Sequence, residues 1–362
     1  MRNILSGRSV FVLGAGATRA FLPGSPLMED DYGLERLLNI FSGHPYAFEI
    51  LQQEKYRNQK KGFINIERLM TRLLGRMPYD LGEKISHELS LLFTELKDEF
   101  IRRVEVAKKD LSNKDELAAF ARLCVKKRIN CITFNYDDVL DQALWEVEKF
   151  YRGRAQDEKQ MPYWHPDGGY GFFVRPSEVT IRDGDRFMDK TSMLLLKLHG
   201  SINWFARMGE RRPYSVDAVL HHQNWYPPSD QGPSGYDPEL IGRHLVPDPF
   251  LIPPVLDKSA LVEEPVLSLV WSLAKEILKN SHEVVFVGYS MPVTDLAASF
   301  LFSEALGERA HIVRAVNLAD KEEDRERVRS AYRKVFPKMR DDQFDFEGAL
   351  KWVRETIRSA QE

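Results

Sequence analysis

The sequence is poor in cysteine, with only Cys124 and Cys131 among 362 residues. Two cysteines cannot build a disulfide framework, and such scarcity is typical of proteins from a reducing compartment. A structural zinc site made of four thiolates is also excluded by this count. We therefore expect a protein without disulfides and without a bound metal.

Long apolar runs and a strong excess of one charge are also missing. No segment is long enough to span a bilayer, and the apolar run after Arg8 is too short for a signal peptide. With 51 basic and 54 acidic residues, no nucleic-acid footprint extends over the whole protein, and no direct nucleic-acid site is evident. We expect a soluble, cytoplasmic protein that makes no membrane contact. The pair His221-His222 is not accompanied by cysteines or histidines at the spacings typical of metal sites. We therefore favour a solvent-exposed or packing role for this pair.

One stretch that is present organises the chain: the apolar run of residues 9–13, which stops at Gly14-Ala15-Gly16. A β-branched and aromatic run of this kind predicts a buried parallel strand that turns into a helix. Helix starts at such turns are where α/β proteins bind phosphates. Because a short glycine pattern is weak evidence, a tight turn without a ligand is an equally good interpretation of the motif alone.

Four later segments repeat this form, namely residues 129–133, 193–198, 283–287 and 312–316. Each ends in small or polar residues, which are Phe134-Asn135-Tyr136-Asp137, His199-Gly200-Ser201, Gly288-Tyr289-Ser290 and Asn317. Because ligands of open parallel sheets bind outside the carboxyl ends of the strands, these segments can meet at one crevice. The sequence therefore predicts an α/β fold, a Rossmann-like doubly wound parallel sheet.

Helical apolar stripes occupy residues 31–120, and the clearest runs through Ile85, Leu89, Leu92, Leu96, Phe100 and Val104. Such stripes are core far more often than cofactor sites. We predict a nucleotide-binding core of residues 1–30 and 121–320, a helical insertion of residues 31–120 and a C-terminal helical segment of residues 321–362. The segments 151–190 and 207–249 are rich in glycine and proline, and whether they close a pocket stays open.

The glycine turn does not match the motifs of two common classes of nucleotide-binding enzyme. Arg19 stands where a dehydrogenase needs its third glycine, and residues 26–31 do not end a second strand on an acidic residue. No Gly-Lys-Ser/Thr follows the glycines either. Hydride transfer and nucleoside triphosphate hydrolysis are therefore disfavoured.

In order and spacing, the motifs Gly14 to Thr18, Thr133 to Asp137, Leu198-His199-Gly200, Gly288-Tyr289-Ser290 and Asn317 resemble the sirtuin superfamily. The bacterial SIR2-like branch is the most similar, and its members pair this domain with anti-phage defence. The segment Pro253 to Lys258 and Asp295 also match that branch. The zinc module of protein deacetylases is missing, and Phe134 replaces their usual glutamine.

The resemblance implies NAD as the substrate and assigns roles to individual residues. Asn135 would orient the nicotinamide ribose or the attacking water, His199 would act as general base, and Asp137 would lie beside the nicotinamide. Contacts to the rest of NAD would come from Gly14, Ala15, Gly16, Thr18, Gly288, Tyr289, Ser290 and Asn317. The bland alternatives are a packing role for Tyr289, helix capping by Asn135 or Asp137, and a core role for His199.

By the same resemblance, we expect a hydrolase, an NAD+ glycohydrolase that depletes NAD as an antiviral, abortive-infection effector. Its activity would be controlled by assembly as a homo-oligomer or by a separately encoded partner, such as a HerA-like ATPase or an Argonaute-type protein. A zinc-free protein deacylase or ADP-ribosyltransferase is one alternative. A non-catalytic module that senses NAD or ADP-ribose is another. The sequence leaves the trigger, the oligomer size and the partner open.

Overall fold

The computed structural model describes residues 9–27, 29–57, 62–75, 77–80, 82–152, 163–172, 174, 191–205, 216, 218–221, 224–226, 249–255, 264–292 and 294–360. The chain divides into two compact units. The first consists of Met1–Phe21, Ser112–Leu251 and Ala260–Glu362, and the second of Leu22–Leu111 and Ile252–Ser259. No helix in the described ranges is long and apolar enough to cross a membrane. The domain boundaries expected from the sequence stay a prediction.

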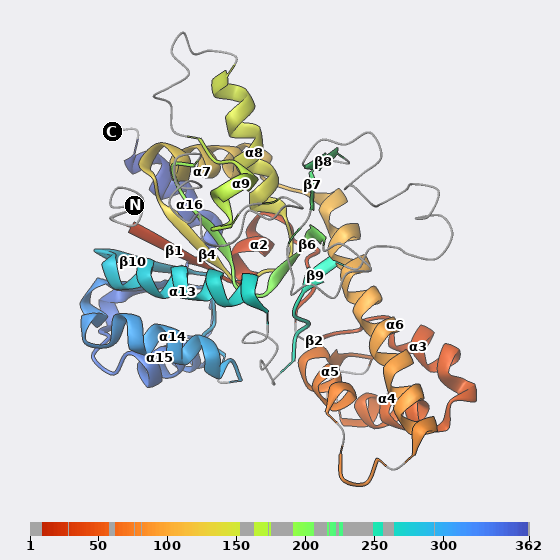
Figure 1. Ribbon diagram of the computed structural model, residues 1–362. Coiled ribbons are helices and arrows are strands. Elements are labelled where there is room, and N and C mark those ends of the chain that lie inside the picture. The colour runs from red at the N-terminus through yellow and green to blue at the C-terminus, as the bar shows by residue number, and fades with distance from the viewer. Residues whose placement is uncertain are drawn as a thin grey trace. The chain divides into compact units, whose positions relative to one another are not determined.

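A parallel sheet of six strands forms the centre of the first unit (Figure 1). Its order is β12-β11-β10-β1-β4-β5, and every neighbouring pair is parallel. The strands are β1 (Ser9–Leu13), β4 (Asn130–Thr133), β5 (Leu195–Lys197), β10 (Glu283–Val287), β11 (Val313–Val316) and β12 (Phe344–Asp345). Numbered along the chain this order is 3-2-1-4-5-6, which confirms the predicted doubly wound α/β fold. The order reverses between β1 and β10.

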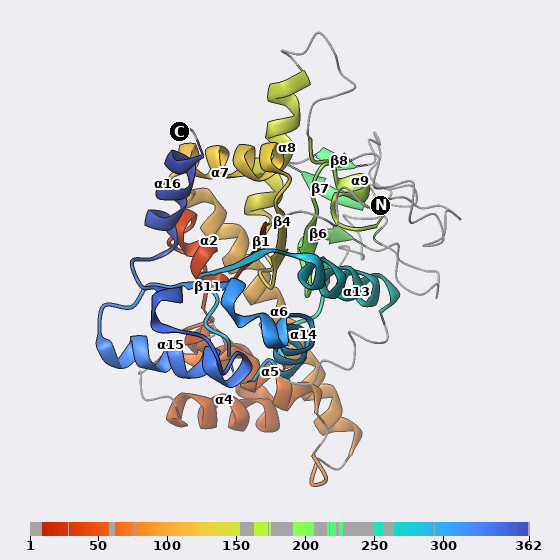
Figure 2. The same ribbon diagram turned by 90° about the vertical axis from the view of Figure 1, so that its left-hand side faces the viewer.

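Helices cover both faces of this sheet (Figures 1 and 2). One face carries α2 (Ala15–Phe21), α7 (Lys114–Lys127), α8 (Val139–Arg152) and α16 (Ala349–Ser359), and the other carries α13 (Pro265–Asn280), α14 (Leu296–Leu306) and α15 (Glu322–Val335). Phe11 of β1 packs on Phe120 of α7, with ring centroids 5.7 Å apart, and Phe286 of β10 packs on Phe302 of α14 at 4.8 Å. Because both faces are buried, the strands read as continuous apolar runs.

A smaller antiparallel sheet follows His199 directly. Its order is β8-β7-β6-β9, with β6 (Gly200–Phe205), β7 (Ala218–His221), β8 (Asn224–Tyr226) and β9 (Pro249–Leu251). Within the segment 207–249, β7 and β8 form a hairpin. The rest of that segment lies mostly outside the described residues, as do most of the segment 151–190 and Lys258. His221 is buried and its ring stacks on Trp145 at 4.1 Å, which is a packing role.

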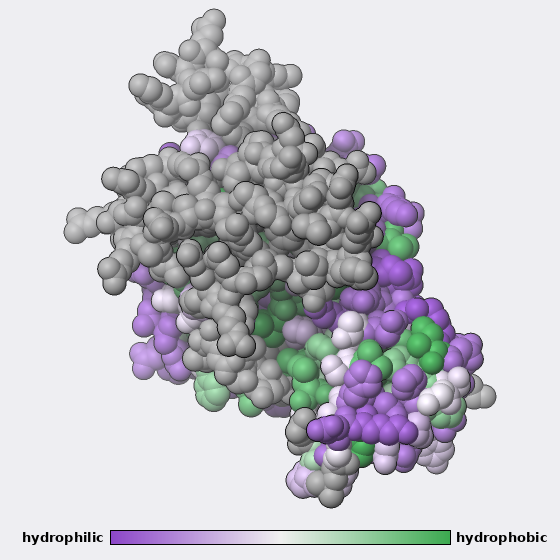
Figure 3. Space-filling model, turned by 45° about the vertical axis from the view of Figure 1, so that its right-hand side comes forward, coloured by the Kyte–Doolittle hydropathy of each residue, from purple (hydrophilic) through white to green (hydrophobic). Residues whose placement is uncertain are grey.

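The second unit is mainly helical. It contains β2 (Glu29–Asp30), α3 (Leu34–Ile40), α4 (Pro45–Arg57), β3 (Ile64–Asn65), α5 (Ile66–Leu74) and α6 (Glu83–Ala107). The apolar stripe of α6 is buried along its whole length, as expected for a core face. Figure 3 shows the visible face of this unit as largely hydrophilic, with smaller hydrophobic areas between.

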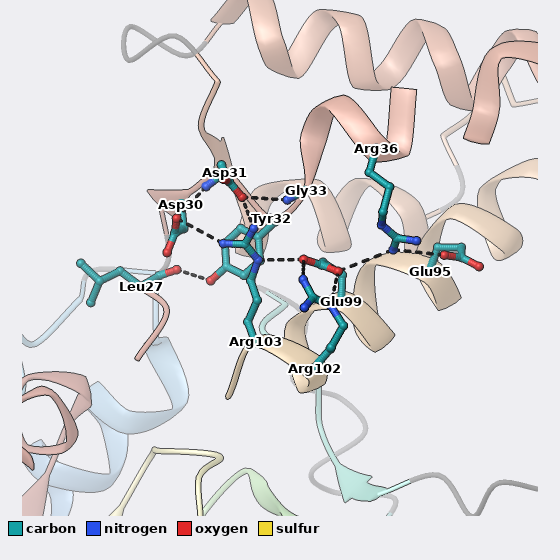
Figure 4. Close-up of polar contacts among 10 residues, drawn as sticks. All are labelled: Leu27, Asp30, Asp31, Tyr32, Gly33, Arg36, Glu95, Glu99, Arg102 and Arg103. Atoms are coloured by element: carbon teal, nitrogen blue, oxygen red, sulfur yellow. Dashed lines mark hydrogen bonds and ion pairs between the residues drawn. The ribbon is translucent and has the colours of Figure 1, made fainter. Parts of the chain in front are cut away.

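An ion-pair network inside the second unit centres on Glu99 of α6, whose side chain is 1% exposed (Figure 4). Its carboxylate accepts hydrogen bonds from Arg102 at 2.6 Å and Arg103 at 2.8 Å, and Arg36 of α3 lies 3.5 Å away. Arg103 also pairs with Asp31. Burial acts to raise the pKa of Glu99, but the hydrogen bonds from the arginines outweigh it, so that this pKa is lowered. The network ties α3 and the turn after β2 to α6.

Candidate functional site

Two turns meet where the strand order of the large sheet reverses. The amide of Gly14 donates to the carbonyl of Val287 at 3.0 Å, and the amide of Gly16 donates to that of Gly288 at 2.9 Å. A Cβ on Gly14 would lie 2.5 Å from the Gly288 oxygen, and one on Gly288, whose φ is +63°, would lie 2.1 Å from the Ala17 nitrogen. The glycines are therefore required for this close approach of the two turns.

Because of this close approach, several main-chain amides of the glycine turn are already used within the chain. The amides of Gly14, Gly16 and Ala17 all donate to carbonyl groups of the chain. Ala15 and Gly16 are exposed at the start of α2, whereas Thr18 faces inward. Pyrophosphate binding by residues 14–18 stays a prediction. It would require either donors other than these amides or a shift of the turn.

The side chains of Asn135, Thr18 and Asp137 form a continuous hydrogen-bonded chain. Nδ2 of Asn135 donates to Thr18 Oγ1 at 2.8 Å and to the Gly14 carbonyl at 2.9 Å. Thr18 Oγ1 then donates to Asp137 Oδ2 at 2.7 Å. Because a carbonyl can only accept, these contacts fix which end of the Asn135 amide is the donor. Its Oδ1 accepts nothing from the described residues, so it is available as an acceptor.

Asp137 has a second task in the same loop. Its Oδ1 accepts the amide of Val139 at 3.1 Å, so the buried carboxylate caps the first turn of α8. Both oxygens of Asp137 are thus held by the chain, which fixes the position of this carboxylate. The capping alternative and a place in the site are therefore compatible.

These three residues line a small pocket at the carboxyl edge of the sheet, with a cavity volume of about 40 Å³. Its polar lining comes from Thr18, Thr133, Asn135, Asp137, Asp141 and Lys197. Its apolar lining comes from β1, β5, β10, α2, α7, α8 and α16, and includes Phe21, Phe120, Leu140 and Val353.

His199 lies two residues after the end of β5 and is buried outside the lining of this pocket. Its ring lies among those of Phe134, Tyr136 and Trp271, with centroids 5.4, 5.8 and 6.4 Å away. Trp271 is held in turn, because its Nε1 donates to the Leu198 carbonyl at 2.8 Å. The aromatic rings therefore fix the orientation of the imidazole.

The remaining predicted residues lie at neighbouring strand ends and do not line the pocket. Tyr289 is buried and stacks on Phe134 at 4.7 Å, while its carbonyl accepts the Tyr332 hydroxyl at 2.7 Å and Asn317 Nδ2 at 3.3 Å. Ser290 is exposed. Tyr289 and Asn317 thus stabilise the turn after β10, and their proposed NAD contacts stay a prediction.

Sequence reasoning missed a buried charged pair in the pocket, Lys197 of β5 and Asp141 of α8. Lys197 Nζ lies 3.0 Å from Asp141 Oδ2, and the two side chains are 0% and 4% exposed. Burial raises the pKa of Asp141, and the charge of Lys197 acts against this shift. The sequence does contain a signal for this pair. Lys197 stands within the apolar run 193–198, which predicts a fully buried strand, and a buried lysine needs a partner.

Among the described residues, no group of three or more histidine, cysteine, aspartate or glutamate side chains is arranged to hold a metal ion. Neither a protein-family model nor a curated protein matches the sequence. The chain is similar to a solved structure of a mutant Sir2 homologue in complex with ADP-ribose, at 13% identity over 99% of this chain and 94% of the other, with a TM-score of 0.41. A second mutant Sir2 homologue, in complex with 2'-O-acetyl ADP-ribose, has the same identity and coverage and a TM-score of 0.38. TM-scores this low assign neither a fold nor an activity to this chain.

Proposed function

We propose that this chain is an NAD+ glycohydrolase of the SIR2-like type, which releases nicotinamide and ADP-ribose. The observation that carries the proposal is the chain Asn135–Thr18–Asp137 in the wall of the pocket. These residues belong to two of the motifs that resemble the sirtuin superfamily, and they stand at the carboxyl edge of a doubly wound sheet, where such folds bind ligands.

The chemistry suits the free oxygen of Asn135. Cleavage of the bond between nicotinamide and ribose proceeds through an oxocarbenium-like transition state, which needs an oriented ribose and a positioned water. Both amide hydrogens of Asn135 are already used within the chain, so Oδ1, which is a hydrogen-bond acceptor, is the atom of this side chain left to bind a ligand. A ribose hydroxyl and a water are both donors of the required kind.

Asp137 supplies a fixed negative charge to the same pocket. Because its oxygens are held by Thr18 and Val139, the carboxylate does not need to reorganise when positive charge develops on the ribose. His199 as general base rests on the resemblance, as do the anti-phage role and control by homo-oligomerisation or a partner.

The test is nicotinamide release from NAD+ by the purified protein, alone and with candidate partner proteins. Asn135→Ala should lower kcat by about a hundredfold, since an orienting contact to the reacting group is lost. Asn280→Ala, on the exposed end of α13, is the matched control and should keep wild-type activity.

Two results would contradict the proposal. Release that requires an acyl-lysine peptide would indicate a deacylase, and NAD binding without any product would indicate a sensor.

A further inference from the structure

Lys197 carries a fully buried ammonium group at the last position of β5, two residues before His199. Its Nζ donates to the main-chain carbonyl of Asp137 and to the carboxylate of Asp141. An ammonium buried this completely is unfavourable unless it is paired and hydrogen-bonded, and here both conditions are met. The three residues come from β5 (Lys197), from the loop after β4 (Asp137) and from the first turn of α8 (Asp141).

The main-chain carbonyl of Asp137 is held in place by its hydrogen bond from Lys197. Within the described ranges, Lys197 is the donor that reaches it, whereas the carbonyl of Tyr136 is held separately by the amide of Ile202 at 2.9 Å and by Ser201 Oγ at 3.2 Å. Rotation of the peptide after Asp137 would displace the Asp137 carboxylate, which is bonded to Thr18. The loop geometry in the pocket is therefore linked to the strand that leads to His199.

We propose that Lys197 is a positioning residue, whose ammonium holds the Asp137 carbonyl and so keeps the segment Asn135–Asp137 in register with β5, the strand that leads to His199. The inference rests on the proposed function for its kinetic consequence. Lys197 itself need not touch NAD, because its effect passes through the main chain of Asp137.

A single substitution at Lys197 would confuse positioning with folding. Lys197→Met leaves the Asp141 carboxylate buried without its counter-charge, which is strongly destabilising. Adding Asp141→Asn removes that charge and still offers an oxygen to the hydroxyl of Tyr170, which donates to Asp141 Oδ1 at 2.5 Å. The double variant should therefore regain stability, but it still lacks the donor to the Asp137 carbonyl.

The experiment compares wild type, Lys197→Met and Lys197→Met/Asp141→Asn, with Lys275→Met as the control for loss of a partly exposed lysine in an ion pair. Stability is measured by urea unfolding, activity by nicotinamide release, and loop order by hydrogen exchange at the amides of Asn135 and Val139. The double variant should unfold close to the wild-type midpoint, keep KM within about threefold and lose about tenfold or more in kcat. Exchange at both amides should be faster than in the wild type.

Each result has a defined reading. If kcat recovers together with stability in the double variant, Lys197 is only structural and the inference is overturned. If the wild type releases no nicotinamide under any condition, the proposed function fails, and the exchange measurement alone decides: unchanged exchange at Asn135 and Val139 in a stable double variant overturns the positioning role.

Discussion

The bridge made by Thr18 gives the sharpest test of the site. Thr18→Val replaces the hydroxyl by a methyl group of nearly equal volume at a position that is 7% exposed. It removes the hydrogen bond to Asp137 Oδ2 and the one from Asn135 Nδ2. A hydrogen bond to a charged group contributes about 1.5–3 kcal/mol and a neutral one about 0.5–1.5 kcal/mol, so we expect a loss of about 2–4 kcal/mol in unfolding free energy.

The assay can report on the first unit alone, because all six tryptophans belong to it. Tryptophan fluorescence in urea should show the midpoint of Thr18→Val lowered by roughly 1 M, for an m-value of about 3 kcal/mol/M. Thr18→Ser is the matched control, since it keeps the hydroxyl and loses only a methyl group. Nicotinamide release should fall in Thr18→Val and be largely kept in Thr18→Ser. Equal midpoints for the valine and serine variants would refute the bridge.

Three further predictions concern other contacts. Gly288→Ala places a Cβ 2.1 Å from the Ala17 nitrogen at a φ of +63°, so tryptophan-monitored urea unfolding should show a loss of at least about 2 kcal/mol, and wild-type stability would contradict the close approach. The lowered pKa of Glu99 means that its stabilising contribution is present above about pH 4.5 and falls as the pH drops through the folded-state pKa. Between pH 7 and about pH 3, circular dichroism should therefore show a larger stability loss for the wild type than for Glu99→Gln, and parallel losses would argue against the network. Glu88→Ala removes the carboxylate that accepts hydrogen bonds from the Tyr46 and Ala47 amides at the start of α4. Unfolding followed by circular dichroism should show a free energy of unfolding lower by about 1 kcal/mol in Glu88→Ala and lowered less in Glu88→Gln, and an unchanged value in Glu88→Ala would exclude this cap.

The sequence by itself determined most of the sheet. The runs at 9–13 and 283–287 match β1 and β10, and the runs at 129–133, 193–198 and 312–316 contain β4, β5 and β11. Strands buried on both faces are continuously apolar, and the residues at which they end follow from local chemistry. The two-residue strand β12 was missed, because so short a segment has no period to recognise.

Only the tertiary structure decided which residues of the candidate site form hydrogen bonds with one another. Thr18 and Asp137 are 119 residues apart, and Lys197 is 60 residues from the carbonyl that it holds. Such pairs depend on which strands become neighbours, and no local pattern specifies that order. The same holds for the glycine turn: the motif Gly14-Ala15-Gly16 is visible in the sequence, but the use of its amides by Val287 and Gly288 follows from the pairing of β1 with β10. Local sequence thus fixed the elements and their polar ends, and strand order decided which of those ends bond to one another.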